Sequence, residues 1–152
     1  MFALPPLYLS MSFQETPSEP PLKLFTLQEA NALLPRIREI VARLQEIYVL
    51  FQQLAEGKSY PASLQRSNGY PRPEAASALP QLREIQALRD EAEALIKEIV
   101  EQGVALKDIE QGLIDFPAER DGRIVYLCWK HGEDEIRFWH ELDTGFAGRQ
   151  PL

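Results

Sequence analysis

Apolar residues recur at alternating spacings of three and four in two long segments of the chain. In the first segment they are Leu27, Ala30, Leu34, Ile37, Val41, Leu44, Tyr48 and Phe51. Such a stripe is typical of a helix packed against another helix at a shallow angle, so we expect a helix over about residues 26–56. Thr26 and Glu29 form a capping box at its start. Pro35 predicts either a kink or a short helical turn followed by a new start, because proline cannot donate a backbone hydrogen bond.

The second segment predicts a helix over about residues 79–102 that ends at Gly103. Its apolar positions are Leu82, Ile85, Leu88, Ala92, Leu95 and Ile99. We expect the two helices to form a long antiparallel hairpin. The connecting residues 57–73 are rich in glycine, proline and basic side chains, which predicts a disordered loop.

After Gly103 the apolar period changes to two, which indicates strands over about residues 113–117, 123–130 and 135–141. Hairpin turns are expected at Asp121-Gly122 and around Gly132. A turn on Gly132-Glu133 would place one set of side chains on the helices: Val125, Leu127, Trp129, Ile136, Phe138 and His140. The wetter face would then carry Tyr126, Cys128, Arg137 and Trp139. A shift of one residue would exchange the strand's two faces.

These elements predict an α+β fold, in which a small C-terminal antiparallel β-meander packs on a long two-helix hairpin. Residues 1–24 hold five prolines and three charged side chains, which predicts a disordered tail. We therefore expect one domain over residues 25–152, a length that can bury a sizeable core without disulfides.

Composition narrows the classes of function. The chain has 152 residues, with 16 Lys and Arg against 23 Asp and Glu, so its net charge of -7 disfavours nucleic acid as the main partner. A single cysteine excludes an intramolecular disulfide and suits a reducing compartment, so we expect a cytoplasmic protein. No apolar run approaches the roughly 20 residues that a membrane span needs.

Four segments carry a resemblance to a known family. They are FTLQEANALLP from Phe25, KD at Lys107 continuing through GLIDFP from Gly112, GRIVYLCW from Gly122, and GE at Gly132 followed by FWHELDTGFAGRQPL from Phe138. Together they resemble a small bacterial family catalogued as domain of unknown function 2203. The resemblance covers about residues 24–152. It implies membership of that family and assigns no catalytic residue.

Polar and aromatic side chains are concentrated in the C-terminal third. One interpretation of this cluster is a metal site. Imidazole, thiolate and carboxylate are the usual ligands of zinc and iron. His140 with Asp143 and the helix carboxylate Glu29 could bind a divalent metal. Cys128 would lie on the opposite face from His140 in the expected register and could not share the ion.

A small-anion or small-molecule pocket is a second possibility. Arg149 and the glycine-flanked backbone of 145–148 offer donors, and Trp129 and Trp139 offer flat walls. The ligand-binding candidates are Asp115, Arg123, Tyr126, Trp139 and Arg149.

A third possibility is nucleophilic catalysis by Cys128 with His131, which requires that the two side chains lie within hydrogen-bond distance and that the thiol pKa is lowered. The plain alternative is that the aromatic residues pack the core and the charged ones pair with each other.

Two classes of function therefore stay open. The first is an accessory or interaction protein that acts as a homodimer, because the apolar stripe of the hairpin is wider than one partner helix covers. The second is a metal- or small-anion-binding protein with a site in the C-terminal cluster, which could be an enzyme.

Overall fold

The computed structural model describes residues 22–55 and 74–152. Two helices precede five strands and a short 3-10 helix: α1 (Leu27–Ala55), α2 (Glu74–Glu101), β1 (Ala105–Asp108), β2 (Leu113–Arg120), β3 (Arg123–Lys130), β4 (Phe138–His140), η2 (Phe146–Gly148) and β5 (Gln150–Pro151). The predicted α+β class is confirmed. The expected loop 57–73 and all but the last three residues of the expected tail lie outside the described residues.

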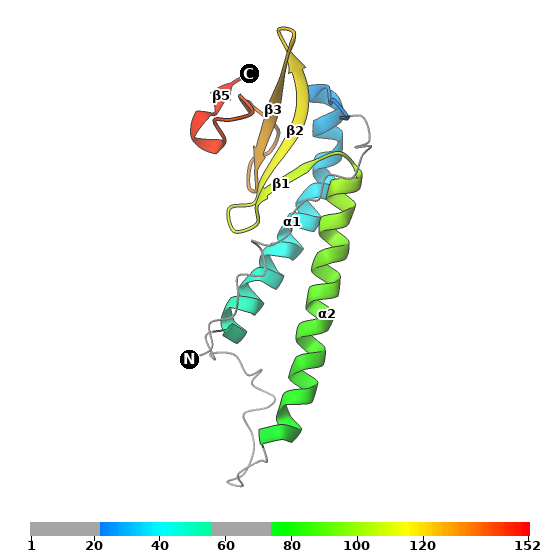
Figure 1. Ribbon diagram of the computed structural model, residues 1–152. Helices are drawn as coiled ribbons and strands as arrows, with labels where there is room; N and C mark the ends of the chain where they lie inside the picture. Colours follow the sequence, from blue (N-terminus) through cyan, green and yellow to red (C-terminus); the bar gives the residue numbers. More distant parts are fainter. Residues whose placement is uncertain (1–21, 56–73) are drawn as a thin grey trace.

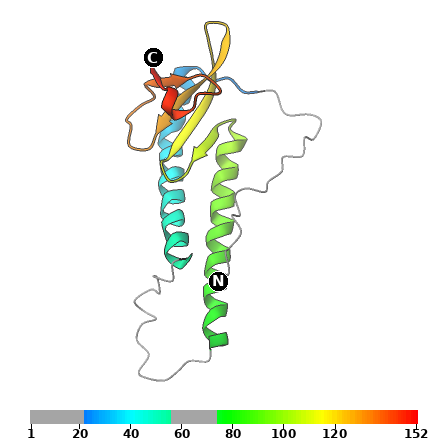
Figure 2. The ribbon, with the colours of Figure 1, turned by 60° about the vertical axis from the view of Figure 1, so that its left-hand side comes forward.

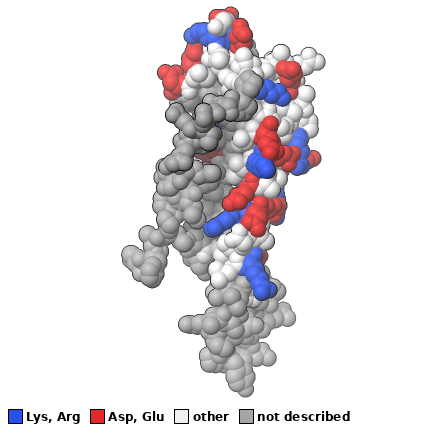
Figure 3. Space-filling model, turned by 45° about the vertical axis from the view of Figure 1, so that its right-hand side comes forward, with Lys and Arg blue, Asp and Glu red and all other residues white. Residues whose placement is uncertain are grey.

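The two helices run antiparallel and are joined by two matching ion pairs. Arg36 donates to both carboxylate oxygens of Glu98, with Nε 2.7 Å from Oε1. Arg43 does the same to Glu91, with Nε 2.6 Å from Oε1. Each pair is one heptad from the other on both helices, so the arginines fix the helix register. Figure 3 shows acidic and basic side chains lying next to one another along this side of the molecule.

Pro35 lies inside α1, which continues as one helix to Ala55, so no second start occurs. The buried positions of α1 explain why the helix tolerates this residue: Ala30, Leu34, Ile37, Ile40, Val41, Leu44 and Ile47 all enter the core. Tertiary packing outweighs the loss of one backbone hydrogen bond. Among the described residues, neither helix has a stretch apolar enough to cross a membrane.

The five strands form an antiparallel sheet in sequence order, so a strand precedes and another follows the three that the sequence indicated. The sheet packs on the N-terminal half of α1, and both helices extend beyond it (Figures 1 and 2). The C-terminal segment, including η2 and β5, lies on the other side of the sheet. The expected turn at Asp121-Gly122 is confirmed: both residues have positive φ, and Arg120 pairs with Arg123.

The register between β3 and β4 differs by one residue from the expected one. Leu127 pairs with Trp139, so Trp139 is buried in the core on the helix side of the sheet. Our expectation that Trp139 lies on the wetter face is wrong. His140 and Phe138 move to the opposite face, where Phe138 is directly across from Cys128. Our expectation that Cys128 and His140 lie on opposite faces is therefore also wrong.

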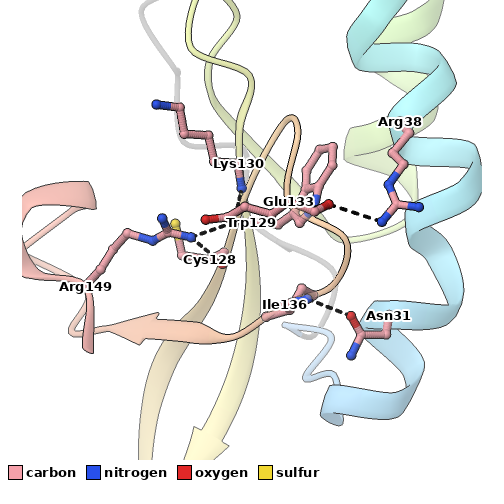
Figure 4. Close-up of polar contacts among 8 residues, drawn as sticks. All are labelled: Asn31, Arg38, Cys128, Trp129, Lys130, Glu133, Ile136 and Arg149. Atoms are coloured by element: carbon pink, nitrogen blue, oxygen red, sulfur yellow. Dashed lines mark hydrogen bonds and ion pairs between the residues drawn. The ribbon is translucent and has the colours of Figure 1, made fainter. Parts of the chain in front are cut away.

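Contacts with α1 explain this register. The backbone N–H of Ile136 donates to Oδ1 of Asn31 over 2.9 Å, and Arg38 donates to the carbonyl oxygens of Glu133 and Asp134 (Figure 4). Nε1 of Trp129 donates to the same Glu133 carbonyl. These bonds hold residues 131–137 on the helix, so the connection is longer than a two-residue hairpin turn.

Gly112 and Gly122 offer a matched test of the packing between sheet and helix. Both have positive φ, which costs an alanine about 1–2 kcal/mol. An added Cβ at Gly112 would lie 2.6 Å from Cβ of His131, whereas at Gly122 it would meet no atom within 4 Å. We predict that Gly122→Ala lowers the free energy of unfolding by about 1 kcal/mol, and Gly112→Ala by about 2–4 kcal/mol. Urea denaturation measures both, and equal losses would contradict the close approach.

Candidate metal centre

Three adjacent strands each supply one metal-ligating side chain to the face of the sheet away from the helices. Asp115 on β2 lies directly opposite Cys128 on β3, and His140 on β4 lies opposite Tyr126. His140 therefore reaches diagonally across β3 toward Asp115. One candidate ligand atom from each of Asp115, Cys128 and His140 lies within 4.8 Å of the other two. All three residues are buried, with 1–2% of their surface exposed.

Hydrogen bonds orient the His140 ring. Nδ1 lies 2.7 Å from the carbonyl oxygen of Glu141, and Nε2 lies 3.0 Å from Oδ2 of Asp115. A carbonyl oxygen can only accept, so Nδ1 carries a proton and donates it. Nε2 faces a carboxylate oxygen, so this contact needs either a proton on one of the two atoms or a cation between them. The other carboxylate oxygen of Asp115, Oδ1, is buried without a hydrogen-bond partner.

The surroundings of Cys128 keep its thiol protonated at neutral pH. Burial, together with the nearby charge of Asp115, raises the pKa of the Cys128 thiol to about 12. Both nitrogens of His140 have other partners, and His131 places Nδ1 2.6 Å from Oε1 of Gln45. The arrangement lacks the thiolate and the nearby base that nucleophilic catalysis by Cys128 requires.

The structure brings His140 together with Asp115 and Cys128, and not with the two carboxylates that the sequence suggested. Glu29 accepts hydrogen bonds from the backbone N–H and the hydroxyl of Thr26, as the capping box requires. These bonds lower the pKa of Glu29. Asp143 is exposed in the turn that follows β4.

The five ligand-binding candidates are divided between the two sides of the sheet. Trp139 is in the core on the helix side, with the guanidinium carbon of Arg120 4.9 Å from its ring centre. Tyr126 is half-buried beside His140, with 5.5 Å between ring centres. Arg123, at the exposed start of β3, pairs with Glu141. Asp115 and Arg149 lie on the side away from the helices, so the expected anion pocket walled by the tryptophans is not assembled.

Arg149 is held beside the cysteine by Glu133. Its Nη2 donates to Oε2 of Glu133 over 2.7 Å and to the carbonyl oxygen of Cys128 over 3.2 Å. Burial would lower the pKa of Arg149, but the hydrogen bond with Glu133 and the interaction with Cys128 hold that pKa above its usual value. Conversely, burial would raise the pKa of Glu133, but Arg149 lowers it.

Sequence reasoning did not assign roles to the Glu133, Arg38 and Asn31 side chains. Glu133 follows Lys130 by three residues and accepts its backbone N–H over 2.8 Å, a local signal that the sequence does contain. Arg38 and Asn31 act across about a hundred residues of chain. No local spacing indicates such contacts.

The fold and this group define an α+β protein that carries a buried aspartate, cysteine and histidine on one face of its sheet. The chain belongs to the family described as "Uncharacterized conserved protein (DUF2203)", whose match covers residues 23–152. Comparisons with curated proteins and with solved structures gave no match.

The raised pKa of the Cys128 thiol gives a prediction for its reactivity in the folded protein. At pH 8 the folded chain should react with a disulfide reagent roughly a thousandfold more slowly than the same chain in denaturant, because few thiols are ionised. The rate for the folded protein should keep rising between pH 9 and 10, where a free thiol approaches its plateau. Fast, complete labelling of the folded protein at pH 8 would contradict the buried position of Cys128.

Proposed function

We propose that this protein binds one transition-metal ion, of the zinc class, through Asp115, Cys128 and His140. The observation that carries the proposal is the convergence of three different donors from three strands, one of which is a carboxylate with an oxygen that lacks a hydrogen-bond partner. Mixed nitrogen, oxygen and sulfur donors favour zinc over magnesium or calcium. In a tetrahedral zinc site, ligand atoms lie roughly 3–4 Å apart, so a small inward movement of these side chains would complete the coordination.

The hydrogen bond from Nδ1 of His140 to the Glu141 carbonyl supports the proposal. Metal-bound histidines commonly donate their other ring N–H to a carbonyl or carboxylate, which fixes the tautomer and the ring orientation. Nε2 then has its lone pair directed at the space shared with Asp115. Without an ion, a shared proton is needed to prevent repulsion between Nε2 and the Asp115 carboxylate, because both are acceptors. A metal ion at this position would attract both.

Burial of the group indicates what the ion does. Three protein donors leave one tetrahedral position for water or a small anion, but the ligands are almost completely inaccessible to a larger substrate. The ion would fasten β2, β3 and β4 to one another. We therefore place the protein among accessory proteins whose fold a bound metal ion stabilises rather than among metalloenzymes, and we expect it in the cytoplasm.

Metal binding can be measured on the whole chain by native mass spectrometry and by titration with Co²⁺, whose thiolate complexes absorb strongly. We predict one ion per chain and a stabilisation of about 2.7 kcal/mol when the free ion is at 100 times its dissociation constant. Asp115→Asn and Cys128→Ser should each lower the affinity at least about 100-fold, because they remove a direct ligand.

Three variants serve as controls. His131→Gln changes the only other histidine, while Glu29→Gln and Asp143→Asn change the carboxylates first suggested by the sequence. All three should bind the ion as tightly as the unaltered chain. A wild-type protein that binds neither Zn²⁺ nor Co²⁺ at micromolar concentration would refute the proposal, and the His140–Asp115 contact would then be a buried ion pair that serves only stability.

A second candidate function, homodimerisation, is supported by the hairpin. The C-terminal part of α1 extends past the sheet (Figure 1) and exposes Val49 and Leu50. These two side chains line a shallow hollow of about 620 Å³ together with Ala42, Arg43, Gln45, Glu46, Gln53 and His131. A second hairpin packed here would complete a four-helix bundle, the usual way in which two such helices bury a wide apolar stripe.

Sedimentation of the full chain tests this second function. We predict a dimer that Val49→Lys and Leu50→Lys each weaken at least about tenfold, because a charged side chain would enter an apolar contact. Ile124→Lys is the matched control, since Ile124 is similarly exposed at the opposite end of the molecule. A monomer at all concentrations, or equal effects of the three substitutions, would exclude this interface.

A further inference from the structure

The C-terminal segment covers the face of the sheet that carries the metal ligands. β5 pairs with β4, with Pro151 opposite Phe138, and the backbone N–H of Leu152 donates to the carbonyl of Arg137. Figures 1 and 2 both place this segment on the side of the sheet away from the helices. The segment explains why the ligands are buried although neither α1 nor α2 packs on that face.

Arg149 is the side chain of this segment that reaches the ligand cluster. Its guanidinium carbon lies 4.2 Å from the centre of the Phe138 ring and 4.9 Å from that of Phe146. Only 13% of the side chain is exposed. Its hydrogen bonds to Glu133 and to the Cys128 carbonyl leave it a single orientation, with the guanidinium next to the Cys128 sulfur (Figure 4).

The buried Nε of this guanidinium has no hydrogen-bond partner. Within the described part of the chain, two buried side-chain atoms lack any hydrogen bond: Oδ1 of Asp115 and Nε of Arg149. Both belong to residues that neighbour the Cys128 side chain. A buried polar atom that lacks a hydrogen bond destabilises the folded protein, so an unpaired acceptor and an unpaired donor beside one thiol call for a common explanation.

We infer that Arg149 is a positioning residue of the metal site, and that its Nε–H donates to the Cys128 thiolate of the metal-bound protein. The inference rests on the proposed function. When the ion binds, the Cys128 S–H bond breaks, its proton goes to solvent, and the sulfur forms a bond to the metal without any change of oxidation state. A thiol is a weak acceptor and a thiolate a strong one. One binding event thus supplies a cation for the carboxylate and an acceptor for Nε.

In this arrangement Arg149 holds the C-terminal segment against the metal site. We call the contact between Nε of Arg149 and the Cys128 sulfur the latch. Donation by Arg149 lowers the electron density on the sulfur, and its anchor on Glu133 holds the C-terminal segment over the ion. Loss of the Nε donor should therefore weaken binding, speed release of the ion to a chelator, and move the sulfur-to-cobalt charge-transfer band to lower energy.

Cobalt titration of the full chain, followed by its absorption spectrum, tests the latch. Arg149→Gln should lower the affinity for Co²⁺ about tenfold, the lower end of what residues behind the ligands contribute, and shift the charge-transfer band to longer wavelength. Arg149→Lys keeps the positive charge but not the Nε donor, and should give the same spectral shift. Arg137→Gln is the control: Arg137 is an exposed arginine paired with Glu135 and should change neither quantity.

The outcomes separate the latch from the site itself. Urea denaturation of each metal-free variant shows which variants fold. If Arg149→Gln does not fold, Arg149→Lys is used for the test. An unchanged band and affinity in the folded Arg149 variants, with binding abolished by Cys128→Ser, would overturn the role of Arg149 and leave the metal site intact. No cobalt band in the wild-type protein would overturn the proposed function, and the latch with it.

Discussion

The pairing of Leu127 with Trp139 is the constraint on which the rest of the C-terminal half depends. In a sheet, successive side chains point to opposite faces, so one residue of register decides the surroundings of every side chain on β4. The observed register sends Trp139 into the core beside α1 and sends His140 to the other face, next to Cys128. With the alternative register, a tryptophan would leave the core and the three candidate ligands could not meet.

The register is in turn set by α1, which contributes more than an apolar surface. Asn31 and Arg38 bind backbone groups of the β3–β4 connection and hold it extended along the helix. On the neighbouring side of α1, Arg36 and Arg43 bind carboxylates of α2 at matching heptad positions. Polar contacts at the two margins of one apolar stripe thus position α1 against α2 and against the sheet. Because α1 is held on both sides, the sheet has a single orientation.

The face away from the helices is stabilised differently. Neither α1 nor α2 covers it, yet Asp115 and His140 are buried there because the C-terminal segment folds back over the sheet and β5 pairs with β4. A buried carboxylate with one unpartnered oxygen is costly unless a positive charge accompanies it. The proposed ion would satisfy that requirement, and Arg149 connects the covering segment to the backbone of Cys128.

The sequence by itself determined the two helices, the hairpin turn at Asp121-Gly122 and the α+β class, because these depend on local periodicity, capping and turn geometry. It also identified His140 and Arg149 as candidate site residues, since their types are unusual in a small core. It could not determine the β3–β4 register, the strands at the two ends of the sheet, or the partners of His140. Those depend on contacts between residues far apart in the chain, where Asn31 and the C-terminal segment decide which side chains face one another.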